Sequence, residues 1–463
     1  MATIEGFKHH ARKSYTLRPV ELRIADHLDV YQPLSVKEIR IQASRCMDCG
    51  TQFCSWGCPL GNLIPYWNEH AQNGDWEEAY RMLRLTNNFP EFTGKICPAL
   101  CETSCSLSIH HGAVTIREIE HTIIETAFKE GWVKPRYPKM RTGKQIAIIG
   151  SGPAGLTVAD ELNAVGHEVT VYERSTEVGG LLRFGIPNFK LEKYVIDRRI
   201  ELMKEAGVKF VTGVEVGTDM SVLKLEEEMD ALVLTGGSTI PRDLQVKGRE
   251  LKGIHYAVDY LSQYTMSVHG LEIEGEVISA KDKTVLVIGG GDTGSDCIGT
   301  AVRQGAKAVY QYEIMPKPPE KADVLMTWPT AANTLKTTSS HEEGAQRFWS
   351  TKTHEFIGSE GKLRGVVASS EDGSEYEIAV DLVFLAMGFL HPAREGMIEA
   401  LSLELDQRGN VATDKKHMTS RKGIFSAGDM RSGQSLVVRA IHEGRIVARD
   451  IDEYLMGDSL LRG

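Results

Sequence analysis

The sequence contains no long apolar run, few aromatic residues and no block of like charges. Only 7% of its 463 residues are aromatic, and its longest apolar stretches, such as residues 285–290 and 382–388, have the length of a strand. A membrane-spanning helix needs about 20 apolar residues, and the N-terminus has no apolar core of the signal-peptide kind. The net charge of −10 is spread without long runs, which argues against a nucleic-acid partner. We therefore expect a cytoplasmic protein that binds neither membranes nor nucleic acids.

Cysteine is also scarce, and its distribution is uneven. Seven of the eight cysteines lie between residues 46 and 105. The eighth, Cys297, is isolated in the sequence, and we interpret it as a small buried apolar residue. Disulfides are rare in cytoplasmic proteins, so the group needs another explanation. Closely spaced thiolates can surround an iron–sulfur core, and prolines follow two of these cysteines, as in ferredoxin-type loops. The motifs CMDCGTQFCSWGCP and ICPALCETSC contain Cys46, Cys49, Cys54, Cys58, Cys97, Cys101 and Cys105.

Two cubane clusters need eight ligands, and this region offers seven cysteines. Residues 112–128 have the pattern of an amphipathic helix that begins soon after the last cysteine of the group. Glu120 and His121 on this segment, or His110 and His111 before it, could supply the eighth ligand. Zinc is the alternative for the first four cysteines, because tetrahedral thiolate sites also use CxxC pairs. Zinc does not explain why the cysteines adjoin nucleotide-binding patterns, so we predict iron–sulfur clusters.

Residues 145–173 have the complete pattern of a βαβ dinucleotide-binding unit. A β-branched run ends in GSGPAG, a helical pattern follows, and a second strand ends at an acid 18 residues beyond the last glycine. The glycines let the backbone approach a pyrophosphate at the helix N-terminus, and the acid accepts ribose hydroxyls. A glycine-rich turn without a ligand is the alternative, but the flanking strands and the acid argue against it. The expected cofactor contacts are Gly150, Gly152, Ala154, Gly155 and Glu173, with Gly180 in the turn that follows.

The same pattern recurs from Thr284, where a second strand leads into GGGDTG. The first glycine and the acid are 24 residues apart here and 23 apart in the first unit. Two dinucleotide cofactors are therefore expected. The contacts predicted in the second unit are Gly289, Gly290, Gly291, Asp292, Thr293, Gly294 and Glu313.

The order of these patterns predicts an α/β protein with two Rossmann-like domains, the second inserted in the first, preceded by an α-helical iron–sulfur domain. The strand at residues 381–388 echoes an earlier one at 230–237. A strand that ends at Gly428 and Asp429 precedes the last helix, where a ribityl chain and its phosphate could bind. Residues 315–349 are irregular, and we expect a long excursion beside the second cofactor, with residues 341–343 on the surface. The predicted domains are residues 1–140 (helical, iron–sulfur), 141–278 and 381–463 (FAD), and 279–380 (NAD(P)H).

Two nucleotide units and iron–sulfur ligands in one chain predict an electron-transfer protein. A nicotinamide gives up a pair of electrons as hydride, iron–sulfur clusters accept electrons singly, and a flavin converts between the two. The expected order is nicotinamide, flavin, clusters and an external acceptor.

The chain resembles the glutamate synthase small (beta) subunit family over essentially its whole length. Its architecture is also similar to the N-terminal electron-input part of dihydropyrimidine dehydrogenase. The resemblance implies that the first fingerprint, with Glu173, Lys190 and Asp429, binds FAD. It implies that the second, with Asp292 and Thr293, binds NADH or NADPH. The motifs that carry it are CMDCGTQFC, NNFPEFTGKICPALCE, AIIGSGPAGL, GGLLRFGIPNFKLEK, VIGGGDTGSDC, EIMPKPPE and AGDMRSGQSLVVRAI.

The resemblance further implies two 4Fe-4S clusters with interleaved ligands. In the second cluster the non-cysteine ligand falls on or beside Glu120, which is preferred over His121. The implied activity is that of an NAD(P)H-dependent oxidoreductase of the glutamate synthase type. Its large (alpha) subunit would make L-glutamate from L-glutamine and 2-oxoglutarate. The implied ligand sets are Cys46, Cys49, Cys54 and Cys105 for one cluster, and Cys58, Cys97, Cys101 and Glu120 for the other.

Several alternatives remain open. The electron-input subunit of a pyrimidine-reducing or ferredoxin-linked enzyme would share these features, and a zinc-stapled scaffold would leave two fingerprints unused. A disulfide reductase would need a CxxC pair beside a nucleotide domain, where only Cys297 lies. Glu313 favours the 2′-hydroxyl of NADH over the 2′-phosphate of NADPH, whereas Lys317 and Lys321 could reach that phosphate. The choice of nicotinamide therefore also stays open.

Overall fold

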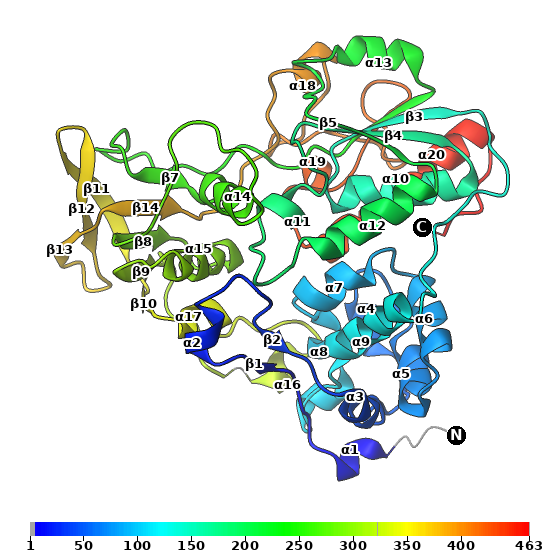
Figure 1. Ribbon diagram of the computed structural model, residues 1–463, viewed down its shortest axis with the longest axis horizontal. Coiled ribbons are helices and arrows are strands. Elements are labelled where there is room, and N and C mark those ends of the chain that lie inside the picture. Colours follow the sequence, from blue (N-terminus) through cyan, green and yellow to red (C-terminus); the bar gives the residue numbers. More distant parts are fainter. Residues whose placement is uncertain (1–4, 322, 463) are drawn as a thin grey trace.

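The computed structural model describes residues 5–321 and 323–462. The outer ends of the first and last predicted domains, residues 1–4 and 463, lie outside this range, as does residue 322 of the predicted excursion. The described chain forms three bodies, one of packed helices and two built on five-stranded sheets (Figure 1). None of its described helices has the length and apolarity needed to cross a membrane.

The first body, which we call the cysteine body, is helical and carries the seven grouped cysteines. Apolar residues at helical spacing bury one face of each long helix, and Trp67, Phe89, Phe92 and Ile119 are fully buried between them. The predicted helix at residues 112–128 begins later, because Gly112 adopts a positive φ of 70°. The helices up to residue 129 are α1 (Gly6–His9), α2 (Val20–Arg23), which lies in the N-terminal arm described below, α3 (Val36–Ala43), α4 (Phe53–Gly57), α5 (Ile64–Asn73), α6 (Trp76–Arg84), α7 (Pro90–Ile96), α8 (Leu100–Thr103), η1 (Ser106–Ile109) and α9 (Ile116–Lys129).

The second body, the flavin body, is built on a parallel sheet with the strand order β15-β6-β3-β4-β5. The central strand β3 is apolar and buried after its first residue, as expected of a parallel strand covered on both faces. Helix α10 follows β3 and packs against the last long helix, α20. Its elements are β3 (Gln145–Ile149), α10 (Pro153–Val165), β4 (Glu168–Glu173), α11 (Leu181–Phe184), α12 (Tyr194–Glu205), β5 (Lys209–Thr212), α13 (Val222–Glu228), β6 (Ala231–Leu234), α18 (Met397–Ala400), β15 (Ile424–Ser426), α19 (Asp429–Ser432) and α20 (Val437–Met456).

The third body, the nicotinamide body, has a parallel sheet with the strand order β10-β9-β8-β14-β7. A small antiparallel sheet, β11-β12-β13, stands beside it. The elements are β7 (Ile254–Tyr256), α14 (Ala257–Val268), β8 (Thr284–Ile288), α15 (Asp292–Arg303), β9 (Ala308–Tyr312), α16 (Val324–Thr327), α17 (Ser339–Glu342), β10 (Ala345–Phe348), β11 (Lys352–Ser359), β12 (Lys362–Ser369), β13 (Glu375–Ala379) and β14 (Leu382–Leu385).

The two sheets repeat one plan. In each, the strand before the glycine loop is central, with the strand after the helix on one side and a later strand, β6 or β14, on the other. The predicted echo between residues 230–237 and 381–388 is thus seen in space. The predicted segment 279–380 does not contain every strand of the nicotinamide sheet. Strands β7 and β14 lie outside it, and both pair within this sheet. The chain enters this sheet before its glycine loop and leaves it after β14, and neither crossing has a local sequence signal.

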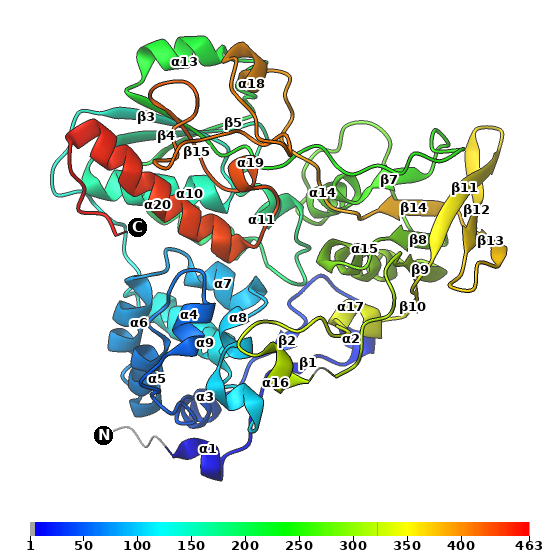
Figure 2. The ribbon, with the colours of Figure 1, turned by 180° about the vertical axis from the view of Figure 1, so that it is seen from behind.

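The N-terminal arm, residues 14–32, connects all three bodies (Figure 2). It contains α2 and the short strands β1 (Thr16–Leu17) and β2 (Tyr31–Gln32). Ser14 donates a hydrogen bond to Glu118 of the cysteine body at 2.5 Å, and the Val30 N–H donates to the Phe189 carbonyl of the flavin body at 3.1 Å. Buried Arg23 donates to Glu343 of the nicotinamide body at 2.7 Å. The arm is therefore a three-way contact rather than a free tail.

The excursion at residues 315–349 reaches further than the sequence suggested. Its helix α17 packs on α15, beside the second glycine loop. Its middle instead contacts the cysteine body, where Trp328 packs on Phe53 at 4.6 Å between ring centroids and Ser104 donates to the Pro329 carbonyl at 2.7 Å. The excursion thus bridges two bodies that are far apart in sequence.

Candidate functional site

The two glycine loops have the same strained geometry. Gly150 and Gly289, which directly follow β3 and β8, have positive φ values of 105° and 124°. A Cβ added at Gly155 or at Gly294 would overlap the carbonyl oxygen of that first glycine. Both loops therefore need glycine at these positions, as the fingerprint requires for a tight turn and close helix packing.

The middle glycine of each loop faces open space. Gly152 and Gly291 are the N-cap residues of α10 and α15, and neither helix has a side-chain cap. A Cβ at either glycine would meet no atom within 4 Å. The uncapped N–H groups and the open approach suit a pyrophosphate at each helix N-terminus.

The acid that ends each second strand lies at its own loop. Glu173 accepts hydrogen bonds from the Ser151 N–H at 3.1 Å and the Ser151 hydroxyl at 2.6 Å. Glu313 accepts one from the Gly290 N–H at 2.7 Å. Each acid also accepts an N–H from the residue two positions later, at 2.8 Å and 2.9 Å. Both carboxylates are thereby fixed beside the loop where a ribose would lie.

Other predicted contacts gather at the start of α10. A Cβ at Gly180 would come 3.0 Å from the Gly152 Cα, and one at Gly428 would come 2.8 Å from the Ala154 Cβ. Asp429 begins α19 after β15 has ended at Ser426, and burial raises its pKa to about 6. These residues, from segments far apart in sequence, form one site with the first loop.

The remaining predicted contacts belong to α15. Asp292 and Thr293 are exposed in its first turn, next to the second loop. Lys190, which the sequence assigned to FAD, forms a buried ion pair with Asp296 of α15. Lys190 therefore links the flavin body to the nicotinamide body.

A support for the second loop was missed by sequence reasoning. Gln311 of β9 donates to the Gly289 carbonyl at 2.9 Å, and its amide oxygen lies 3.0 Å from His341 Nε2. Burial lowers the pKa of His341 to about 4, so the imidazole is neutral at pH 7. The expectation that residues 341–343 lie on the surface holds for Glu342 but is wrong for the other two residues, because His341 is buried and Glu343 is enclosed between Arg23 and Arg303. A glutamine in a buried strand was the only local signal.

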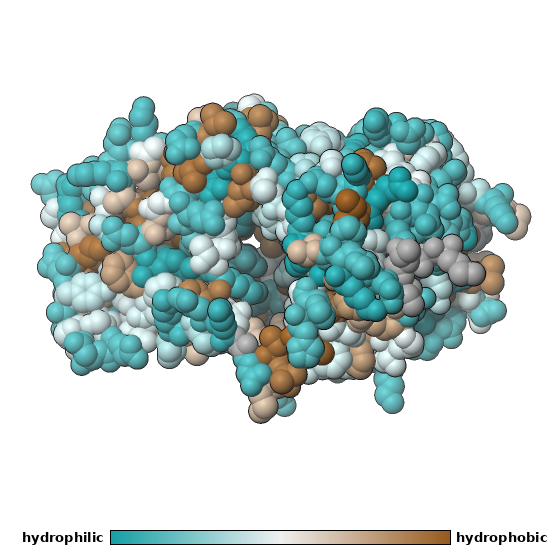
Figure 3. All heavy atoms as spheres, turned by 90° about the horizontal axis from the view of Figure 1, so that it is seen from below, coloured by the Kyte–Doolittle hydropathy of each residue, from teal (hydrophilic) through white to brown (hydrophobic). Residues whose placement is uncertain are grey.

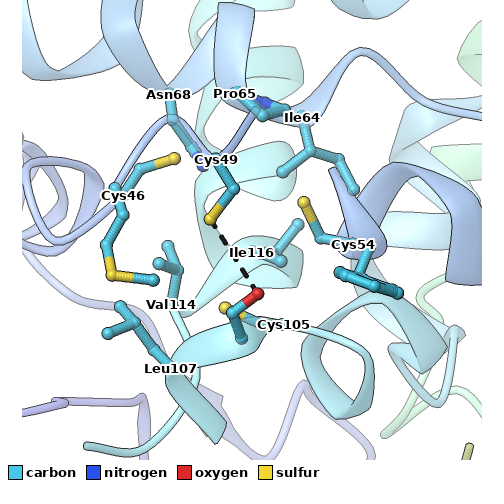
Figure 4. Close-up of a pocket in the computed structure, with 13 residues that line it drawn as sticks. Cys46, Cys49, Cys54, Ile64, Pro65, Asn68, Cys105, Leu107, Val114 and Ile116 are labelled. Atoms are coloured by element: carbon cyan, nitrogen blue, oxygen red, sulfur yellow. Dashed lines mark hydrogen bonds between the residues drawn. The ribbon is translucent and has the colours of Figure 1, made fainter. Parts of the chain in front are cut away.

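The seven grouped thiols divide into two sets. Figure 4 shows the first set, whose side chains surround one pocket lined by α4, α5, η1, the start of α9 and the loop that follows α3. Ser106 Oγ lies 3.9 Å from Cys49 Sγ at its edge. We call this the four-thiol pocket, and its cysteines are Cys46, Cys49, Cys54 and Cys105.

The second set combines three thiols with one carboxylate. Burial raises the pKa of Cys58 to about 11 and of Cys97 to about 12, and the nearby Glu120 carboxylate adds to the rise at each, as it does at Cys101. Glu120 is buried on α9, and burial raises its pKa to about 7. His121 instead lies 4.0 Å from Glu125. We call the second set the Glu120 set: Cys58, Cys97, Cys101 and Glu120.

The spacing of the ligands separates a cluster from a single ion. Within residues 5–321 and 323–462, no three Cys, His, Asp or Glu side chains are close enough to hold one metal ion. A zinc ion needs its sulfur ligands at about 2.3 Å. The four thiols line a pocket instead, which suits a bulkier inorganic core, and their burial calls for a positive core to hold them as thiolates.

Comparisons with known proteins match the cysteine region and the glycine-loop region to two different families. Residues 144–444 match the family described as pyridine nucleotide-disulphide oxidoreductase, and residues 23–132 match dihydropyrimidine dehydrogenase domain II, 4Fe-4S cluster. The glutamate synthase [NADPH] small chain of Mycobacterium tuberculosis (strain ATCC 25618 / H37Rv) is 48% identical, over 100% of this chain and 98% of that protein. The chain belongs to the glutamate synthase small chain family. The small chain of Bacillus subtilis is 42% identical over 98% of this chain and 99% of that protein.

Two further comparisons add to the family assignment. The glutamate synthase [NADH] of Schizosaccharomyces pombe is 43% identical over 99% of this chain, which corresponds to only 23% of that protein. Among solved structures, T. acidophilum thioredoxin reductase has a TM-score of 0.51 at 22% identity and covers 68% of this chain and 99% of its own. Mycobacterium tuberculosis FprA in complex with NADPH has a TM-score of 0.53 at 16% identity, over 68% of this chain and 85% of its own. These two structures share the fold.

The family membership confirms several predictions from the sequence. The fold class is confirmed: an iron–sulfur domain is followed in the chain by two Rossmann-like sheets. The cofactor classes are FAD, NAD(P)H and 4Fe-4S. The chain is an NAD(P)H-dependent oxidoreductase of the glutamate synthase type.

Proposed function

We propose that this chain is the electron-input subunit of a glutamate synthase. It takes hydride from NAD(P)H at the nicotinamide body and delivers electrons one at a time, through the two thiol sets, to a large subunit that makes L-glutamate from L-glutamine and 2-oxoglutarate. The observation that carries the proposal is that one chain combines two matching glycine loops with two separate ligand sets. When bound, FAD supplies the exchange between hydride and single-electron chemistry, and the clusters accept single electrons.

The residues of the flavin body would hold FAD. The uncapped N-terminus of α10 would bind the pyrophosphate, which Gly150, Gly152 and Gly155 allow to approach closely. Glu173 would accept the ribose hydroxyls. Ala154, Gly180, Gly428 and Asp429 would line the rest of the site, and Lys190 would approach from the side of the nicotinamide body.

The residues of the nicotinamide body would hold the exchangeable nucleotide in the same way. Gly289, Gly291 and Gly294 would admit its pyrophosphate to the N-terminus of α15, together with Gly290, Asp292 and Thr293. Glu313 would accept the adenosine ribose hydroxyls, which favours NADH. Relatives named for NADPH and for NADH are both similar to this chain, so kcat/KM measured with each nucleotide decides the preference.

The thiol sets would hold two 4Fe-4S clusters. The four-thiol pocket would hold one with Cys46, Cys49, Cys54 and Cys105, and the Glu120 set would hold the other with one carboxylate ligand. Replacing Glu120 with Ala should lower the iron content and remove one of two cluster signals in the electron paramagnetic resonance (EPR) spectrum. Unchanged iron with both signals intact would exclude Glu120 as a ligand.

The partner is proposed to be the glutamate synthase large subunit. The matching segment of the Schizosaccharomyces pombe protein is part of a much longer chain, which supports a lasting association between the two functions. We also place the assembly in the cytoplasm, because seven grouped cysteines without disulfides suit a reducing compartment.

An anaerobic preparation of the full chain tests the proposal. It should contain FAD and iron, and it should oxidise NADH or NADPH with an artificial one-electron acceptor. With the large subunit added, oxidation should require both glutamine and 2-oxoglutarate. A preparation without FAD or iron, or nucleotide oxidation by the complex that ignores both substrates, would overturn the proposal.

A further inference from the structure

The buried face of α5 contains one amide among apolar side chains. Ile64, Trp67 and Ala71 follow the helical spacing and are buried in the cysteine body. Asn68 lies on the same face and is 0% exposed. Its side chain lines the four-thiol pocket next to Cys46 (Figure 4).

Neither polar atom of the Asn68 side chain has a hydrogen-bond partner in the described part of the chain. A buried amide without a partner destabilises the fold, and such groups are rare in native proteins. The Asn68 side chain lies in the lining of the four-thiol pocket together with Cys46, Cys49, Cys54 and Cys105, and it is the amide closest to Cys46 in that lining (Figure 4). The amide is therefore directed at sulfur, and its partner belongs to whatever fills the pocket.

We propose that Asn68 donates a hydrogen bond from its side-chain amide to a sulfur of the 4Fe-4S cluster in the four-thiol pocket, and thereby raises the reduction potential of that cluster. The sulfur is either the Cys46 thiolate or an adjacent inorganic sulfide. A donor to sulfur stabilises the reduced state more than the oxidised state, because the reduced state carries one more negative charge. This inference rests on the proposed function, which supplies the cluster.

The hydrogen-bond donors near the Glu120 set differ from Asn68 because they already have partners. Asn87 Nδ2 donates to Glu120 at 3.0 Å, and Thr93 also donates to this carboxylate, so both donors have partners within the protein. The set lies on the side of the flavin body, because α7 packs against α12 and Glu91 pairs there with Arg199. Helix α5, which lines the four-thiol pocket, lies farther from the flavin body (Figure 1). A higher potential in the four-thiol pocket would favour electron movement away from the flavin.

Anaerobic redox titration of the full chain, followed by EPR, tests the role of Asn68. Asn68→Leu keeps the size of the side chain and removes its donor, and Asn68→Asp replaces the donor with an acceptor. Both should keep FAD and iron, and both should shift one cluster potential to more negative values while the other stays unchanged. The matched control is Trp67→Phe, which removes an equally buried, unpartnered donor from the same helix outside the pocket lining. It should leave both potentials unchanged.

A second measurement does not depend on the variants assembling. Full chain containing asparagine labelled with ¹⁵N only in the side-chain amide is reduced, and pulsed EPR is used to look for a ¹⁵N coupling. The coupling should be present in the unsubstituted chain and in Trp67→Phe. A labelled, iron-containing chain without it, or iron-replete Asn68 variants with unshifted potentials, would overturn the role of Asn68. Absence of iron from the unsubstituted chain would instead overturn the proposed function.

Discussion

The flavin and nicotinamide bodies contain nearly the same nucleotide-binding unit in different surroundings. The strand order, the positive φ of the first glycine, the uncapped helix and the acid bonded to the loop N–H recur in both. The flavin loop is backed by α20 of its own body. The nicotinamide loop is braced by Gln311 and His341, and the arm residue Arg23 contacts the helix that carries His341. The loop chemistry is local, whereas the support is assembled from distant segments.

The largest expected effect separates the two loops. Gly155→Val should abolish FAD binding, and Gly294→Val should abolish nicotinamide binding while FAD is retained. In each case the new side chain overlaps a backbone carbonyl, at a cost of more than about 4 kcal/mol. FAD absorbance and nucleotide titration measure the two outcomes. If both variants lost the same cofactor, the assignment of the loops would be wrong.

The next effect tests the arm, which contacts the nicotinamide body through Arg23. Arg23→Leu should weaken docking of the arm by about 3 kcal/mol, because a buried ion pair loses one partner although Arg303 still faces Glu343. Hydrogen exchange should rise in residues 14–32 and in α17 while FAD and iron content stay constant. The control Arg18→Leu breaks a part-buried pair with Asp26 and long hydrogen bonds to two carbonyls, all inside the arm, and should cost less than about 1 kcal/mol. Equal exchange in both variants would contradict a special role for Arg23.

Replacing the acids Glu313 and Glu173 should have a smaller effect, which should again differ between the nicotinamide body and the flavin body. Glu313→Ala should raise KM for the preferred nicotinamide about 10- to 100-fold, because a charged hydrogen bond to a ribose is worth about 1.5–3 kcal/mol. Glu173→Ala should instead lower FAD occupancy and leave the KM of the remaining holoprotein unchanged. Steady-state kinetics and flavin content distinguish these results.

The smallest effect depends on pH and involves His341 alone. Its pKa is about 4 in the folded chain and near 6.5 when unfolded, so the unfolded state binds more protons between these values. Stability is fully present above pH 6.5 and falls by about 1–2 kcal/mol as the pH drops to 5. His341→Gln should be less stable at pH 7 and should lose this part of the pH dependence. Denaturant unfolding at both pH values measures it, and an unchanged pH slope in the variant would contradict the assignment.

The sequence predicted those parts of the site whose residues are close together in the chain. Each glycine loop and its acid lie within one βαβ unit, so spacing alone placed them, and the structure has them where expected. The division of the cysteines could not be read from spacing, because Cys105 joins a pocket formed mainly by residues 46–68. It came from the family resemblance.

Long-range contacts account for what was missed. His341 pairs with Gln311 across 30 residues, and Arg23 pairs with Glu343 across 320. Polar residues such as these look like a solvated surface in a linear sequence, and only the fold buries them. The sheet to which β7 and β14 belong was missed for the same reason, since they join a sheet whose central strand lies between them in the chain.

The contacts made by the arm and by the excursion limit which parts of the chain can be removed. Removing residues 1–32 would strip a guanidinium from the carboxylate of Glu343 and uncover Phe189 and Tyr264, which pack with Val30. Excising the nicotinamide body would take Trp328 away from Phe53 at the rim of the four-thiol pocket. The three bodies therefore cannot be exchanged independently of one another. A chimaera with the nicotinamide body of another protein would need matching changes where the arm and the excursion make these contacts.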